Sequence, residues 1–163
     1  MITGDADPRI LRRALGCFAT GVAIVTAKVP GDAPVGVTIN SFASLSLDPP
    51  LVLWSLYGRS PSLARFRTAS HFAINVLAAD QEALSRRFAT PMPEKFAGVD
   101  WADGLGSAPL LPDCAARFEC ARLTATKQGD HMLFSGCIER FWQGERDALI
   151  FYRGRYVREV RDG

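Results

Sequence analysis

Long runs of apolar residues, broken by short groups of glycine, proline and aspartate, dominate the hydrophobic pattern of the chain. Most of these runs have the length of a β-strand and lie between turn-forming residues. We predict strands at 22–29, 37–46, 51–57, 72–77, 116–127, 131–143 and 148–160. The first two strands are joined by a polar, turn-like segment and form a predicted hairpin, and the last three form a predicted meander.

Three segments show helical spacing instead. Apolar residues recur every three or four positions between residues 10 and 18, directly after Asp7-Pro8, where Asp caps the first turn and Pro begins it. Ser60-Pro61 gives the same signal for the short helix SLARFRTA, and Asp80 caps a third helix, QEALSRRFA. These segments predict three short helices.

Strands joined by short turns, with so few helices, favour an antiparallel barrel over a doubly wound parallel sheet. Residues 90–113 are rich in Pro, Gly and Asp and predict a surface excursion, a type of segment that carries function or covers a site. With 163 residues, 48% of them apolar, the chain has the length and composition of one folded domain. We therefore predict a single, mainly β domain over 1–163.

Charge and cysteine content argue against several classes of protein. A net charge of +2 gives no basic footprint for a nucleic-acid partner. The first ten residues lack the features of a signal peptide, and the apolar runs are too short to span a bilayer. We expect a cytoplasmic protein without membrane contact. Cysteines at 17, 114, 120 and 137 form no CxxC pair, which favours reduced thiols over a metal site.

Familiar nucleotide-binding motifs are absent from the sequence. GDAPVGVT has the glycine spacing of a P-loop, but Val37 stands where the phosphate-binding lysine is required. The GLG at 104–106 lacks the third glycine and the preceding strand of a Rossmann fingerprint. A nicotinamide cofactor would therefore have to bind in another way.

Hydroxyl and amide side chains are interleaved with apolar ones between residues 38 and 46. One interpretation is a solvated strand end, where such residues are frequent. The other is a wall for a flat heteroaromatic ligand such as an isoalloxazine, whose apolar faces and polar rim need small polar groups beside apolar ones. The polar members of the segment are Thr38, Asn40, Ser41, Ser44 and Ser46.

Two further signals have a functional and a simpler interpretation. Arg59, Ser60 and Ser62 surround the start of a short helix, where free amides and the helix dipole favour an anion such as a flavin phosphate. Alternatively, Ser60 merely caps the helix. Gly129-Asp130-His131 forms a tight turn, in which the histidine contacts a ligand or is simply solvated.

Six motifs, in order along the chain, resemble those of the short-chain flavin reductases, the NAD(P)H-dependent reductase components of two-component flavin monooxygenases. They are FATGVAIVT, TINSFASLSLDPPLV, FAINVL followed by Gln81 and Leu84, FAG at 96–98, GDH at 129–131 and YRGRY. The resemblance covers about residues 10–157. It implies an FMN-binding split β-barrel, a homodimer with flavin near the subunit interface, and no separate dinucleotide domain.

The resemblance also implies which residues contact the cofactors. The flavin ring and ribityl chain would contact Thr38, Asn40, Ser41, Phe42, Ser44, Leu45, Ser55 and Leu56, and the phosphate end would lie at Arg59, Ser60 and Ser62. Further contacts would come from Phe72, Ala73, Asn75, Lys95 and Phe96. The nicotinamide would lie at Gly129, Asp130 and the catalytic His131, with Tyr152 and Arg153 as neighbours.

The implied function is hydride transfer from NADH or NADPH to FMN or FAD, with delivery of the reduced flavin to a partner monooxygenase. His131 would position the nicotinamide carboxamide or donate a proton to reduced flavin, and we favour positioning. Two alternatives are a flavin oxidase of the pyridoxamine phosphate oxidase type and a non-catalytic flavin-binding module. The sequence leaves open which nicotinamide and which flavin are used.

Overall fold

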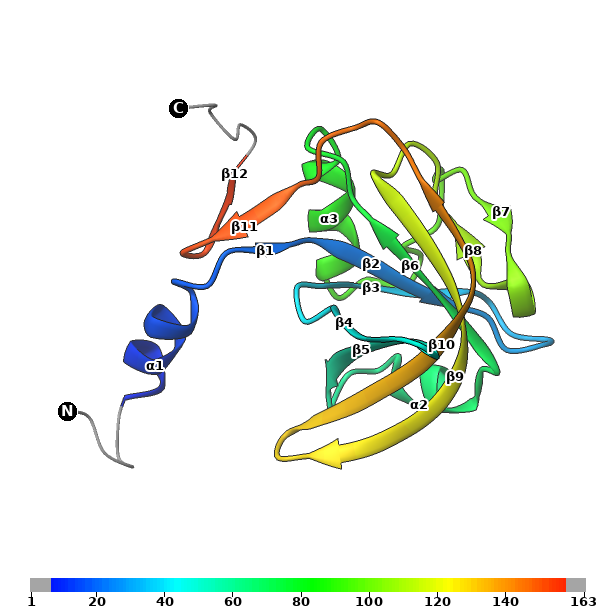
Figure 1. Ribbon diagram of the computed structural model, residues 1–163, viewed down its shortest axis with the longest axis horizontal. Coiled ribbons are helices and arrows are strands. Elements are labelled where there is room, and N and C mark those ends of the chain that lie inside the picture. Colours follow the sequence, from blue (N-terminus) through cyan, green and yellow to red (C-terminus); the bar gives the residue numbers. More distant parts are fainter. Residues whose placement is uncertain (1–6, 158–163) are drawn as a thin grey trace.

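A seven-stranded antiparallel sheet forms the centre of the molecule. The computed structural model describes residues 7–157, and the strand order in this sheet is β3-β2-β6-β9-β10-β5-β4 (Figure 1). The strands are β2 (Ala23–Ala27), β3 (Val35–Ile39), β4 (Ala43–Leu47), β5 (Pro50–Tyr57), β6 (His71–Val76), β9 (Ala116–Gln128) and β10 (His131–Gln143). Every neighbouring pair is antiparallel, which confirms the predicted fold class.

The sheet curls so that its two edge strands approach each other. Strands β3 and β4 lie at opposite ends of the strand order, yet only residues 40–42 connect them. Because four Cα steps span at most about 14 Å, the two edges meet at this point. The prediction of one strand at 37–46 is therefore wrong: the chain leaves one edge of the sheet at Ile39 and joins the other at Ala43. We call residues 40–42 the crossing.

Aromatic side chains fill the inside of the curled sheet. The Trp54 ring stacks on Phe134 with centroids 4.4 Å apart, and Phe66 and Phe72 meet it edge-on at 5.1 and 5.7 Å. All four side chains are buried. The cluster joins β5, β6 and β10 to helix α2 (Leu63–Thr68), which fixes the position of that helix against the barrel.

A second apolar cluster lies beneath helix α3 (Glu82–Ala89), where Phe88 and Leu111 are fully buried. The predicted excursion supplies part of its cover, because Phe96 and Trp101 pack against it. The excursion contains short strands β7 (Ala102–Asp103) and β8 (Pro109–Leu110) and the 3-10 turn η1 (Leu105–Ser107). It is therefore a folded lid on the second cluster.

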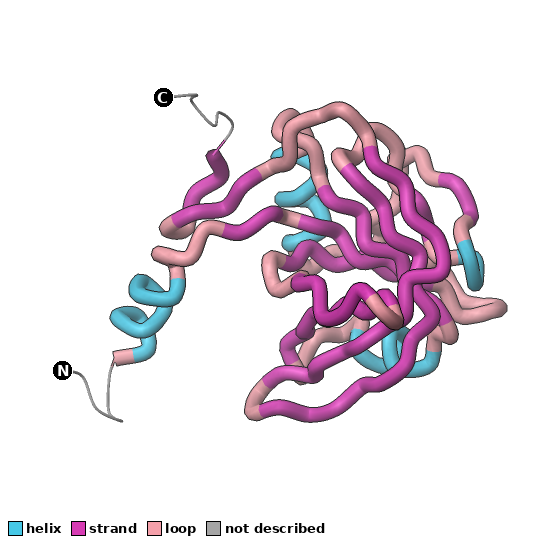
Figure 2. The backbone as a smooth tube through the Cα atoms, viewed as in Figure 1, coloured by secondary structure: helices cyan, strands magenta, loops and turns pink. Residues whose placement is uncertain are grey.

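An arm extends from the barrel, as the tube in Figure 2 shows. It consists of helix α1 (Pro8–Leu15) and a three-stranded sheet of β1 (Thr20–Gly21), β11 (Ile150–Tyr152) and β12 (Arg155–Val157). The predicted third strand of the meander, 148–160, is wrong in its pairing: it breaks between β11 and β12, and β11 pairs with β1 rather than with β10. Residues 158–160 lie outside the described residues.

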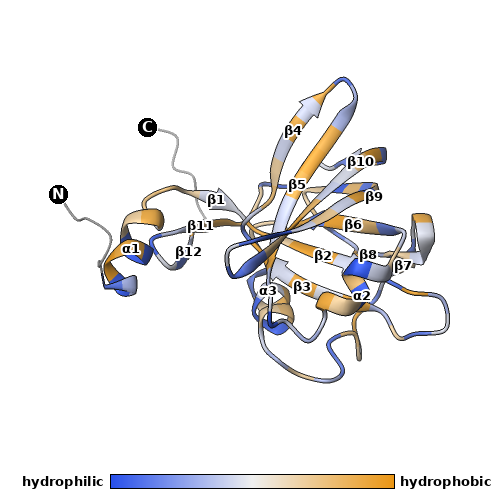
Figure 3. Cartoon of the chain, turned by 90° about the horizontal axis from the view of Figure 1, so that it is seen from below, coloured by the Kyte–Doolittle hydropathy of each residue, from blue (hydrophilic) through white to orange (hydrophobic). Residues whose placement is uncertain are grey.

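Helix α1 exposes its apolar face in the single chain. It contains no buried residue, and Ile10, Leu11, Leu15 and Phe18 are 45 to 78% exposed. Figure 3 shows this apolar colouring on α1 and along β4 and β5. A helix of eight residues is not stable without packing partners, so this face needs a cover that the single chain does not provide.

Helix starts differ from the sequence prediction at two of the three helices. At α1 the prediction is confirmed, because the Asp7 side chain accepts from the backbone N–H of Arg9 at 2.9 Å. Helix α2 begins at Leu63 rather than at Ser62, and helix α3 has Gln81 at its N-cap position. Asp80 does not cap α3, because its carboxylate pairs with Arg146 across the molecule.

Within residues 7–157, no helix is long and apolar enough to cross a membrane. The same residues contain no group of three or more side chains able to hold a metal ion. All four cysteines are free thiols, and burial raises the pKa values of Cys114 and Cys120 to about 12.

Candidate functional site

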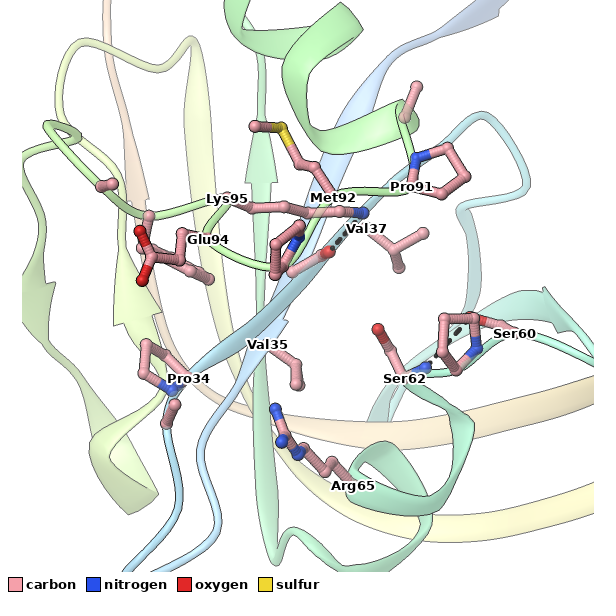
Figure 4. Close-up of a pocket in the computed structure, with 17 residues that line it drawn as sticks. Pro34, Val35, Val37, Ser60, Ser62, Arg65, Pro91, Met92, Glu94 and Lys95 are labelled. Atoms are coloured by element: carbon pink, nitrogen blue, oxygen red, sulfur yellow. Dashed lines mark hydrogen bonds between the residues drawn. The ribbon is translucent and has the colours of Figure 1, made fainter.

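A pocket of about 860 Å³ lies between strand β3 and the start of helix α2. Its walls come from three segments: residues 33–37, residues 60–62 with Arg65, and residues 89–97 except Thr90. Figure 4 shows Ser60, Ser62 and Arg65 facing the segment that carries Lys95. The structure thus brings together four residues predicted from the sequence, Ser60, Ser62, Lys95 and Phe96, and we call this space the β3–α2 pocket.

The α2 side of the pocket suits an anion. Arg65 is exposed and makes no ion pair within residues 7–157, and the hydroxyls of Ser60 and Ser62 lie on the same wall. The Ser60 hydroxyl accepts weakly from the Ser62 N–H at 3.4 Å, and no side chain caps the helix. Because α2 has only six residues, its dipole is short, and the guanidinium is the stronger attraction for phosphate.

Sequence reasoning missed Arg65, although a signal was present. Arg65 stands three residues after Ser62, and this spacing places both side chains on one face of a helix. The predicted Arg59 lies instead in the exposed turn before α2 and does not line the pocket.

Lys95 and Arg87 hold the opposite wall in place. The Lys95 ammonium donates to the Phe88 carbonyl at 2.7 Å and to the Gly36 carbonyl at 3.4 Å, and burial lowers the pKa of Lys95. The Arg87 guanidinium donates to the carbonyls of Lys95, Glu94 and Ala97. One arginine therefore holds three carbonyl groups of the wall segment.

The crossing begins three residues beyond Val37, the last residue of β3 that lines the pocket. The Ser41 hydroxyl donates to the Ser55 carbonyl and accepts from the Ser55 N–H, both at 3.0 Å. This side chain extends the ladder of β4 and β5, whose backbone pairing ends at Ala43 and Leu53. The chain can cross between the sheet edges here because a hydroxyl replaces a backbone partner.

Other predicted wall residues divide between the surface and the interior. Asn40, Ser44 and Leu45 are exposed. Thr38 is half-buried and donates to the Ser85 carbonyl at 2.7 Å, which ties β3 to α3. Phe42 packs on the barrel core beside Phe118. The surface of the crossing is therefore a mixture of amide, hydroxyl and apolar groups.

Four predicted contacts prove to be core residues. Leu56, Phe72, Ala73 and Asn75 are each at most 5% exposed. Asn75 is polar, but its amide donates to the Ile24 carbonyl at 3.1 Å and its oxygen accepts from the Leu111 N–H at 2.9 Å. These side chains support the wall from inside, and their contact with a flavin stays a prediction.

His131 lies at the start of β10, after the turn that begins at Gly129, where φ is +59°. Its Nδ1 lies 2.7 Å from Oδ1 of Asp130, and this hydrogen bond lowers the pKa of the Asp130 carboxyl. Because an ionised carboxylate can only accept a hydrogen bond, Nδ1 carries the proton, and Nε2 is available for a hydrogen bond to another partner. The Tyr57 ring meets the imidazole edge-on at 5.7 Å, so the histidine is held on two sides.

Tyr152 and Arg153 lie on the arm rather than beside His131 in the sheet. Tyr152 ends β11 and is exposed, and Arg153 begins the turn to β12. Arg153 shares a second pocket with Asn40 of the crossing.

Comparison with known proteins agrees with this geometry. The model of the flavin reductase like domain matches residues 15–159. The NADH-dependent FMN reductase SmoA of Agrobacterium fabrum is 45% identical over 160 residues, which cover 98% of this chain and 91% of that protein. The reductase component of a trigonelline monooxygenase from Acinetobacter baylyi is 42% identical over 91% of this chain, which spans 48% of that protein.

A solved structure is also closely similar. The NADH:FAD oxidoreductase SgcE6 of Streptomyces globisporus, in complex with NAD and FAD fragments, superposes with a TM-score of 0.92 at 36% identity. The match covers 99% of this chain and 98% of that one. Together with the curled antiparallel sheet and the pocket beside its crossing, these matches show that the chain belongs to the flavin reductase like domain family.

Proposed function

We propose that this protein is an NAD(P)H-dependent flavin reductase that transfers hydride from a reduced nicotinamide to FMN or FAD and supplies reduced flavin to a partner monooxygenase. The observation that carries the proposal is the β3–α2 pocket, with a guanidinium and two hydroxyls on one wall and with strand β3, which leads to the crossing, on another, in a chain of this family. Strand β3 thus runs from a pocket that suits an anion to a polar, small-residue surface. That order matches a flavin, which has a phosphate at one end and a ring with a polar rim at the other.

The residues present fit a flavin phosphate. Arg65 offers a guanidinium, and Ser60 and Ser62 offer hydroxyls, on one wall of the pocket. Charge-assisted hydrogen bonds to phosphate oxygens are about twice as strong as neutral ones. Glu94 also lines the pocket, on the opposite wall. The phosphate would therefore lie against α2, away from this carboxylate.

The crossing would receive the ring. Val37 lines the pocket and Asn40 belongs to the crossing, and three strand residues span about 10 Å. Exposed Asn40 and Ser44 supply polar groups for the ring rim, and Leu45 supplies an apolar face. When bound, the flavin accepts the hydride from the nicotinamide. The protein's task is to bind, orient and exclude water.

His131 would orient the nicotinamide. Asp130 holds Nδ1 at 2.7 Å, so Nε2 points to a partner outside this pair. We assign it a hydrogen bond to the nicotinamide carboxamide rather than a proton-transfer role. Asp130 is then a positioning residue, because it acts through the imidazole.

Three further properties belong to the same proposal. A second copy of the chain would cover the exposed apolar face of α1 (Ile10, Leu11, Leu15 and Phe18), which gives a homodimer. Reduced flavin has to leave for the monooxygenase, in keeping with relatives such as the trigonelline monooxygenase component. Both NADH and NADPH are candidate donors, and a cytoplasmic location is consistent with four free thiols.

The matched pair His131→Ala and His71→Ala tests the proposal. The sequence has only two histidines, and the seven residue steps of β9 from Ala121 to Gln128, their paired residues, separate them by about 23 Å along the strand. We expect His131→Ala to raise the KM for NADH about two- to tenfold, the value of one hydrogen bond, and to leave the flavin Kd within twofold.

The control His71→Ala should change neither quantity by more than twofold. Equal losses of nicotinamide use and flavin binding in His131→Ala would show that His131 is structural. Absence of flavin-supported oxidation of both NADH and NADPH by the unmodified protein would refute the reductase function itself and leave the binding module as the alternative.

A further inference from the structure

Tyr156 is the last residue of the YRGRY motif, of which the proposed function uses only Tyr152 and Arg153. Strand β12 carries Tyr156 on the arm. The Tyr156 hydroxyl lies 2.9 Å from the hydroxyl of Ser85, which is fully buried in helix α3 and is 71 residues earlier in the sequence. This hydrogen bond therefore joins the arm to the barrel.

The Ser85 hydroxyl depends on Tyr156 for its hydrogen bond. Among residues 7–157, the structure gives this hydroxyl no other partner. Ser85 stands inside α3, where a serine hydroxyl without a partner donates to the carbonyl four residues earlier, here that of Gln81. Such a bond bends a helix and slightly destabilises it. By engaging the hydroxyl, Tyr156 keeps it from the backbone of the helix.

The backbone of the same serine holds the end of strand β3. The Ser85 carbonyl accepts a hydrogen bond from the Thr38 hydroxyl at 2.7 Å. Thr38 stands two positions before Asn40, where the crossing begins, and the resemblance implies that Thr38 contacts the flavin. One residue of α3 therefore contacts the arm through its side chain and the proposed flavin surface through its carbonyl.

Helix α3 packs too closely on β3 to move without an effect on the β3–α2 pocket. A Cβ at Gly36 would lie 2.6 Å from the ring of Phe88, which is fully buried. The Phe88 carbonyl also accepts from the Lys95 ammonium, at 2.7 Å, on the wall of the pocket. A bend of α3 at Ser85 therefore displaces both the end of β3 and this wall.

Ring contacts hold Tyr156 independently of its hydroxyl. The Arg86 guanidinium lies 5.0 Å from the centroid of the tyrosine ring, and the Phe151 ring of β11 meets it edge-on at 5.3 Å. Arg86 is itself held by the Glu82 carboxylate at 2.8 Å. The variant Tyr156→Phe therefore keeps these ring contacts and removes only the hydroxyl.

We propose that Tyr156 is a positioning residue for the flavin site, an inference that rests on the proposed reductase function. Its hydroxyl holds the Ser85 side chain away from the helix backbone, so that the Ser85 carbonyl keeps Thr38 and the crossing in the arrangement that binds flavin. When the crossing spends only a fraction of the time in this arrangement, the flavin Kd rises by the inverse of that fraction. One hydrogen bond sets the fraction at about one third to one tenth.

Fluorescence titration with FMN and with FAD tests the proposal. We expect Tyr156→Phe to raise the flavin Kd about three- to tenfold. Ser85→Ala removes the hydroxyl that would bend α3. It should therefore change the Kd less than about twofold by itself, and it should restore the Kd to within about twofold of the unmodified protein in the double variant Ser85→Ala/Tyr156→Phe.

The control Thr90→Val also removes a hydroxyl at helix α3. Thr90 is exposed at the end of the helix, its hydroxyl donates to the Arg86 carbonyl at 2.8 Å, and it does not line the β3–α2 pocket. This variant should leave the flavin Kd within about twofold of the unmodified protein. The thermal midpoint Tm of every variant is measured beside its Kd.

Rescue by Ser85→Ala separates positioning from a merely structural role. If Tyr156 only fastens the arm, Tyr156→Phe should lower the Tm and leave the flavin Kd unchanged, and that result would overturn the proposal. A Kd that stays raised in the double variant would overturn it as well, because the Ser85 hydroxyl would then not be the cause of the loss.

Amide hydrogen exchange without any ligand distinguishes failure of this proposal from failure of the reductase function. Exchange in residues 38–42 should be about three- to tenfold faster in Tyr156→Phe and should return to the unmodified rate in the double variant. If the unmodified protein binds no flavin but shows this exchange pattern, the reductase function is refuted and the link from Tyr156 to the crossing stands. Unchanged exchange in Tyr156→Phe would refute the link whether or not flavin binds.

Discussion

The two asparagines of the sequence offer a sharp test of how the site is built. Asn75 is buried beneath the wall, and Asn40 is exposed in the crossing. We expect Asn75→Ala to destabilise the fold and Asn40→Ala to weaken ligand use. The same substitution at the same residue type should therefore give opposite results.

The magnitude for Asn75→Ala follows from its hydrogen bonds. The Leu111 N–H loses its acceptor at 2.9 Å and stays buried, which costs about 1–3 kcal/mol. The amide also donates to the Ile24 carbonyl at 3.1 Å and the Thr26 hydroxyl at 3.2 Å, worth about 1 kcal/mol each. We expect a total near 4 kcal/mol, or a Tm lower by about 8–16 °C for a chain of this size.

Thermal unfolding followed by circular dichroism measures this loss, and flavin titration below the transition measures binding. Asn75→Ala should bind flavin within about threefold of the unmodified protein while it is folded. Asn40→Ala should unfold within about 0.5 kcal/mol of the unmodified protein, since it removes an exposed side chain. A stable Asn75→Ala protein that has lost flavin affinity would refute the assignment of Asn75 to the core.

Three other predictions concern packing, the pocket wall and the thiols. Gly36→Val should destabilise the fold by about 1–3 kcal/mol in urea unfolding, because a Cβ there would lie 2.6 Å from a core phenylalanine ring. Arg87→Met should raise the flavin Kd about tenfold and open the wall segment to limited proteolysis, and Arg87→Lys should not rescue it, because an ammonium cannot reach three carbonyls. At pH 8 a disulfide reagent should label exposed Cys17 rapidly but Cys114 and Cys120 only after unfolding, since a pKa of about 12 leaves about one such thiol in ten thousand ionised. Rapid labelling of three thiols in the native protein would contradict their burial.

Much of the barrel follows from local sequence pattern. The apolar runs and their bounding turns identify β2, β5, β6, β9 and β10, since each strand carries its own alternation and turn residues. The split of 37–46 into two strands could not be predicted, because local alternation does not specify which sheet edge a strand joins. The arm was missed for the same reason: the pairing of β1 with β11 is a tertiary event.

Residues of the candidate site could be predicted where they belong to a motif of the family. Ser60, Ser62 and Lys95, which the resemblance assigned to the flavin site, line one pocket. Arg65 looked like an ordinary solvent-facing residue, because a charged side chain on a short helix needs no special explanation. The burial of the Asn75 side chain could not be predicted, because burial with complete hydrogen bonding leaves no trace in the sequence.

The central claim is that hydride moves from the nicotinamide to a bound flavin on this protein. Anaerobic mixing of NADH with the protein and FMN tests it most directly, with the visible absorbance of flavin and the near-ultraviolet absorbance of NADH followed together. The account predicts bleaching of one flavin for each NADH oxidised, at a rate that saturates with both ligands. Flavin that binds but stays oxidised in the presence of excess NADH and NADPH would contradict it.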